Sequence, residues 1–86
     1  MPGGVHNPIV TQKSPRVQAA IAGLTREFVA ECLRIAAIKA THGADNLEIG
    51  DDHNAERDIR IAVQNIREAG RAFRELQHLL KEEAAR

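Results

Sequence analysis

The chain has 86 residues, with 12 basic and 12 acidic side chains, one cysteine, and neither Trp nor Tyr. Zero net charge and two phenylalanines as the only aromatics argue against bulk nucleic-acid binding, which relies on excess positive charge and base stacking. A lone cysteine excludes an intrachain disulfide, and so short a chain buries little surface, so we expect it to need a partner chain for stability.

Residues 1–13 are predicted to form an extended arm, because Pro2, Gly3, Gly4 and Pro8 disfavour helix. No basic stretch precedes an apolar run here, so we expect no signal peptide. No apolar segment approaches the roughly 20 residues that span a bilayer, so we expect no membrane partner. The single thiol also suits a reducing compartment. We therefore expect a cytoplasmic protein of a bacterium or of a phage-infected cell.

A first helix is predicted over about residues 15–42. Ser14 is a good N-cap, and Pro15 suits the first helical position because it has no N–H to leave unpaired. His42-Gly43 is predicted to end the helix, since Gly readily adopts the left-handed conformation. Apolar residues recur along one face of this helix, and they are Val17, Ile21, Leu24, Phe28, Cys32 and Ile35.

A turn over about residues 43–51 and a second helix over about residues 52–84 follow, with Asp51 or Asp52 as the N-cap. The second helix carries a heptad seam, in which apolar residues alternate at spacings of three and four. Gly70 flanks this seam. We expect that another helix approaches closely there, which would explain a glycine inside a helix. The seam residues are Ile59, Ala62, Ile66, Ala69, Phe73, Leu76 and Leu80.

The predicted fold is therefore all-α: an antiparallel two-helix hairpin that assembles as a helical-bundle oligomer. Each helix has an apolar face wider than one neighbouring helix covers, so we expect a homo-oligomer, a dimer or larger. The expected core seam combines the second-helix residues above with Ile21, Leu24, Phe28 and Ile35 of the first helix.

Basic residues suggest a site for a small anion. Nine of the 12 basic side chains are arginines, which grip phosphate and carboxylate in a bidentate manner. The start of the first helix attracts anions, and an antiparallel hairpin brings the end of the second helix close to it. The alternative is a solvated face on which interleaved glutamates neutralise the arginines. The candidate ligand-binding residues are Lys13, Arg16, Arg71, Arg74 and Lys81.

No catalytic arrangement is recognised, so we expect neither an enzyme nor a cofactor, and we assign no metal ligand. A metal-binding, ferritin-like bundle remains an alternative, because Glu75 and His78 match the Glu-x-x-His element of such proteins. The seam, however, directs both side chains away from the expected core, where bundle metals bind.

The segment from Ile61 to Phe73 resembles the second helix of a family of phage helical hairpins, the sponges that sequester cyclic-nucleotide immune signals of anti-phage defence. That helix reads apolar-Ala-x-x-x-apolar-x-Glu-Ala, which Ile61, Ala62, Ile66, Glu68 and Ala69 reproduce. The resemblance implies an oligomer of hairpins that holds small anionic nucleotides between subunits without catalysis. No ligand residue is carried over, since the first helix lacks the family's aromatic residue near its start.

The function predicted from the sequence is non-enzymatic binding of a small anionic ligand by a helical oligomer, with sequestration of a nucleotide signal as the specific form. The first alternative is a structural or adaptor module that oligomerises and binds another protein. The second is the metal-binding bundle.

Overall fold

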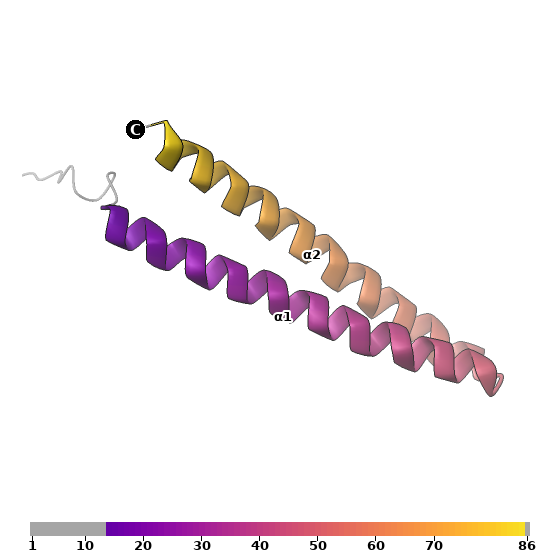
Figure 1. The fold of residues 1–86 in the computed structure, drawn as a ribbon. Coiled ribbons are helices and arrows are strands. Elements are labelled where there is room, and N and C mark those ends of the chain that lie inside the picture. The colour runs from indigo at the N-terminus through magenta and orange to yellow at the C-terminus, as the bar shows by residue number, and fades with distance from the viewer. Residues whose placement is uncertain (1–13, 86) are drawn as a thin grey trace, which may run out of the picture.

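A computed structural model describes residues 14–85 of the chain. It contains two helices, α1 (Pro15–Glu48) and α2 (Asp52–Ala84), which run antiparallel and pack along their length (Figure 1). The hairpin is elongated, since the 34 residues of α1 span roughly 50 Å. The predicted all-α hairpin is confirmed. The predicted arm over residues 1–13 lies outside the described residues.

Both helices begin where the sequence predicts. The Ser14 hydroxyl accepts a hydrogen bond from the Val17 N–H, and Pro15 takes the first helical position. The Asp51 carboxylate accepts one from the Asn54 N–H, which makes Asp51 rather than Asp52 the N-cap of α2. Each cap satisfies a backbone donor that has no partner inside its helix.

The predicted end of the first helix at residue 42 is wrong, and so is the turn over residues 43–51. Helix α1 continues through Gly43 to Glu48, and the left-handed glycine that ends it is Gly50, with φ of 79°. The N–H groups of Gly50 and Asp51 donate to the carbonyls of Leu47 and Asn46, the pattern of a Schellman motif. Gly43 is instead a buried contact with α2: a Cβ built on it would lie 3.5 Å from the Asp58 Cβ.

The interior of the hairpin is built from small and polar residues. Leu76 is the only large aliphatic side chain among the buried apolar residues of the described chain. The buried positions follow heptad spacing on both helices, so the two backbones approach closely along a narrow strip. The buried residues are Gln18, Ala22, Cys32, Ala36 and Gly43 on α1, and Ala55, Asp58, Ala69, Ala72 and Leu76 on α2.

This interior divides the predicted α2 seam in two. Ala69 and Leu76 are buried and Ala62 is half-buried, as expected for core residues. The other four members, Ile59, Ile66, Phe73 and Leu80, are exposed in the single hairpin. Their places facing α1 are taken by Asp58, Asn65, Ala72 and Leu79, each one residue earlier along the chain. At three of these four positions the inward residue is smaller than the Ile or Phe that follows it, which lets the helices approach more closely.

The α1 part of the predicted seam is divided too. Ile21 and Ile35 are half-buried, whereas Leu24 and Phe28 are exposed. Cys32 is buried, as expected of a small apolar residue. Within residues 14–85, no helix is both long and apolar enough for a membrane crossing.

Candidate interaction surfaces

Each helix carries a second heptad row of large apolar residues, which lies beside the strip where the two helices pack. On α1 this row comprises Val17, Ile21, Leu24, Phe28, Ile35 and Ile38, here called the α1 surface. On α2 it comprises Ile59, Val63, Ile66, Phe73 and Leu80, here called the α2 surface. Phe28 is 49% exposed and Phe73 is 47% exposed. Contiguous exposed apolar patches are typical of surfaces that bind another molecule.

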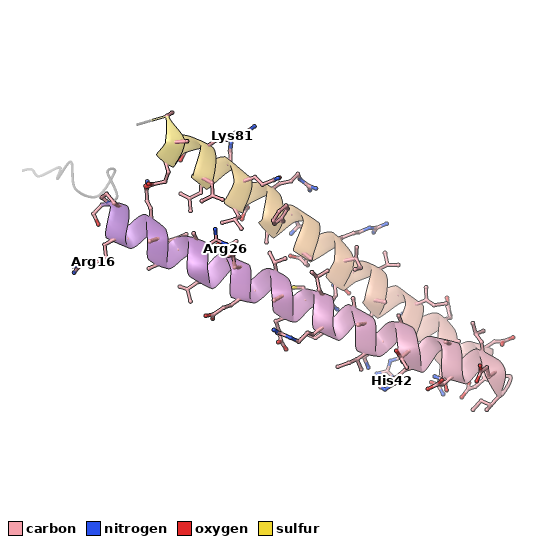
Figure 2. The ribbon with its side chains drawn as sticks, viewed as in Figure 1. Arg16, Arg26, His42 and Lys81 are labelled. Carbon is pink, nitrogen blue, oxygen red and sulfur yellow. The ribbon has the colours of Figure 1, made fainter. Side chains whose placement is uncertain are left out.

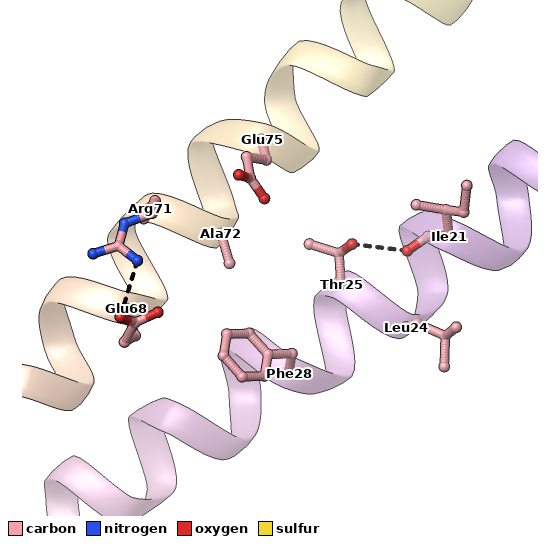
Figure 3. Close-up of a pocket in the computed structure, with 8 residues that line it drawn as sticks. All are labelled: Ile21, Leu24, Thr25, Phe28, Glu68, Arg71, Ala72 and Glu75. Carbon is pink, nitrogen blue, oxygen red and sulfur yellow. Dashed lines mark hydrogen bonds and ion pairs between the residues drawn. The ribbon is translucent and has the colours of Figure 1, made fainter. Parts of the chain in front are cut away.

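The α1 surface borders a groove of about 360 Å³ between the helices. Ile21, Leu24 and Phe28 line it from α1, and Glu68, Arg71 and Glu75 are among the residues that line it from α2. Figure 3 shows the Phe28 ring directed toward α2 and the Glu75 carboxylate directed toward α1. The α1 side of the groove is therefore mainly apolar, and its α2 side carries two carboxylates, of which Glu68 is paired with Arg71.

The α2 surface lies on the other side of the hairpin. Ile66 and Phe73 each precede a groove glutamate by two residues, and two residues of α-helix turn the side-chain direction by about 200°. Leu80 accordingly lines a separate cavity, together with Ala19 and Arg26 of α1. One molecule docked on one side of the hairpin therefore covers one apolar surface and leaves the other exposed.

Two charged rows of opposite sign run along α2 beside these surfaces. Glu68, Glu75 and Glu82, the acidic row, lie on the groove side of α2, where Glu75 and Glu82 also line a second cavity with Ile21. Arg67, Arg74 and Lys81, the basic row, flank the α2 surface on the side of α2 turned away from α1. Both rows repeat every seven residues, which is about 10 Å along a helix.

The basic row has no acidic partner in the hairpin. No Asp or Glu stands three or four residues from Arg67, Arg74 or Lys81 within the described helix, so the usual helix-surface pairs cannot form. The ion pairs of α2 instead join Arg60 to Glu56 at 3.5 Å and Arg71 to Glu68 at 3.0 Å. The alternative of a fully self-neutralised α2 face therefore does not hold for the basic row.

The hairpin separates the predicted anion-binding residues. Arg74 and Lys81 lie together in the basic row, but Arg71 lies on the groove side and is paired with Glu68. Arg16 in the first turn of α1 points away from Lys81, so the two occupy opposite outer edges (Figure 2). Lys13 lies outside the described residues. A single chain thus does not gather these five residues into one pocket.

Polar residues inside the hairpin are the feature that the sequence analysis missed. The Asn46 amide donates a 2.8 Å hydrogen bond to the carboxylate of buried Asp58. Gln18 is buried near the other end and lines a cavity with Glu83. The signal was present, because Asp58 and Asn65 continue the spacing of Ala62, Ala69, Ala72 and Leu76.

The groups considered as metal ligands are dispersed. Glu75 and His78 are exposed and line a cavity at the edge of the hairpin, not the strip between its helices. Among residues 14–85, no three His, Cys, Asp or Glu side chains gather closely enough to hold a metal ion. Comparison of the chain with protein-family models, curated proteins and solved structures finds no match.

Proposed function

We propose that this chain is a non-enzymatic, self-assembling helical module whose hairpins associate through the α1 and α2 surfaces. One observation carries the proposal: small residues fill the hairpin interior, while Leu24, Phe28, Ile66 and Phe73 lie outside it, each at least 47% exposed. Two helices joined through small residues bury little apolar area, whereas ordering each residue costs about 1–2 kcal/mol of conformational entropy. A second copy supplies the missing apolar contacts.

Self-association is tested by sedimentation over a wide concentration range. The wild-type chain is expected to form an oligomer, and Ile66→Asp is expected to shift it toward a smaller species, since a carboxylate on the α2 surface would have to be buried. Gln64→Asp is the matched control, because Gln64 is exposed on another side of α2. A wild-type monomer at every concentration contradicts the proposal, as does equal loss of assembly in both variants.

A second candidate function is binding of a small anion, such as a cyclic nucleotide signal, at the boundary between copies. The basic row supports it, because Arg67, Arg74 and Lys81 are exposed and lack acidic partners within the described helix. Guanidinium groups bind phosphate oxygens through charge-assisted hydrogen bonds. Sequestration requires no chemical step, so the ligand is recovered unchanged after the protein is denatured.

Calorimetry with cyclic dinucleotides and trinucleotides tests this candidate on the assembled protein. Binding is expected to weaken at least tenfold in Arg74→Gln/Lys81→Gln and to weaken as salt is added. Arg57→Gln, an exposed arginine outside the basic row, is the control. Absence of binding at high micromolar ligand removes this candidate and leaves self-assembly as the proposed function.

A further inference from the structure

The two apolar surfaces differ in the charge that accompanies them. The groove beside the α1 surface carries the acidic row, in which Glu75 and Glu82 make no ion pair within residues 14–85. The α2 surface is flanked by the basic row, whose members are equally unpaired within the described helix. Within residues 14–85, the groove thus carries two unpaired glutamates beside the Arg71–Glu68 ion pair, whereas the α2 surface is flanked by three unpaired basic side chains.

The two surfaces also match in spacing. Both charged rows and both apolar rows repeat every seven residues, so an α2 helix laid along the groove aligns its charges with the acidic row at about 10 Å intervals. Apolar contact in the middle and opposite charges along the edge are how paired helices select their partner and orientation.

We infer that the α2 surface of one copy docks into the groove of another, with Arg67, Arg74 and Lys81 beside the partner's acidic row. This inference rests on the proposed self-assembly and specifies its geometry. The contact joins two different surfaces, so after a single contact one copy keeps a free groove and the other keeps a free α2 surface. Such an interface continues from copy to copy until it closes into a ring or extends as a filament.

A pair of charge reversals tests this contact. Arg74→Glu/Lys81→Glu gives both rows a net negative charge, and Glu75→Arg/Glu82→Arg gives both rows a net positive charge, since two of three members change. All four residues are exposed, so both variants are expected to keep the helical hairpin, which circular dichroism checks. Each variant alone is expected to lose assembly at least tenfold, because like charges would meet. An equal mixture of the two restores assembly, since every contact then joins opposite charges.

The charge-preserving variant Arg74→Lys/Lys81→Arg is the control and retains assembly. If each reversal variant assembles alone as the wild type does, the inferred contact is wrong, although self-assembly itself stands. The inference is also overturned if both variants dissociate and their mixture stays dissociated. A monomeric wild-type chain would overturn the proposed function as well and assign the surfaces to another protein.

Discussion

The Asn46 amide reaches across the hairpin and donates a 2.8 Å hydrogen bond to the carboxylate of Asp58. The two residues come from different helices, close to the turn, in an interior otherwise dominated by Ala, Gly and Cys. A side-chain pair of this kind forms in one alignment of the helices, because sliding α2 by a turn would separate the two groups and leave Asp58 unbonded. The pair therefore helps to set the register of the hairpin.

Removal of one member of this pair is expected to destabilise the hairpin. Asn46→Ala takes the amide from a buried carboxylate, which costs about 1–3 kcal/mol. The double variant Asn46→Leu/Asp58→Ala removes both polar groups and is expected to recover most of that loss. Urea denaturation of all three proteins measures the difference. Equal stability of wild type and Asn46→Ala would show that the hydrogen bond contributes nothing.

Substitutions at Gly43 separate helix propensity from close packing. A Cβ at this position lies 3.5 Å from the Asp58 Cβ and 3.8 Å from the Ala55 carbonyl oxygen, which are ordinary contact distances. Gly43→Ala is therefore expected to stabilise the hairpin by about 0.5–1 kcal/mol, because Ala favours helix. Gly43→Leu is expected to destabilise it by forcing the helices apart. Thermal melting of both variants measures this, and a more stable Leu variant would contradict the close approach.

The Asp51 cap makes the start of α2 sensitive to acid. Hydrogen bonds from the Asn54 side chain and backbone N–H lower the pKa of Asp51 below its ordinary value. A lowered folded-state pKa contributes stability that is present above the unfolded-state pKa and is lost as the pH falls through the folded-state value.

Asp51→Asn is expected to remove this acid sensitivity while it retains a capping side chain. Melting temperatures at neutral and acidic pH, compared between wild type and variant, isolate this effect from the other carboxylates. Asp51→Ala is expected to lower the melting temperature at neutral pH as well. An identical pH profile for wild type and Asp51→Asn would contradict the stabilising role of the charged cap.

Gly70 distinguishes the single hairpin from its assembly. A Cβ at this position meets only the Arg74 guanidinium, at 3.6 Å, so α1 does not require a glycine there. Gly70→Ala is expected to stabilise the hairpin by up to about 1 kcal/mol. Gly70→Leu is expected to weaken self-assembly, because Gly70 lies between Ile66 and Phe73 on the α2 surface. Denaturation of dilute protein and sedimentation of concentrated protein report the two effects separately.

The local sequence determined the two helices and most of their ends. Ser14-Pro15 and Asp51 place helix starts through short-range hydrogen bonds, and the three-and-four spacing of apolar residues identifies helical faces whatever they pack against. The hairpin fold follows from these features, because a short connection between two amphipathic helices brings them together antiparallel.

Only the tertiary structure decided which face of each helix turned inward. Asn65 and Ile66 belong to two overlapping heptad rows about 100° apart, and both rows have a spacing that suits helix packing. The row with smaller side chains faces α1, because closer backbones and the Asn46–Asp58 hydrogen bond become available once a second helix is present. Gly43 also shows what tertiary structure decides. A glycine can end a helix, but Gly43 lies inside α1, because α2 packs against it.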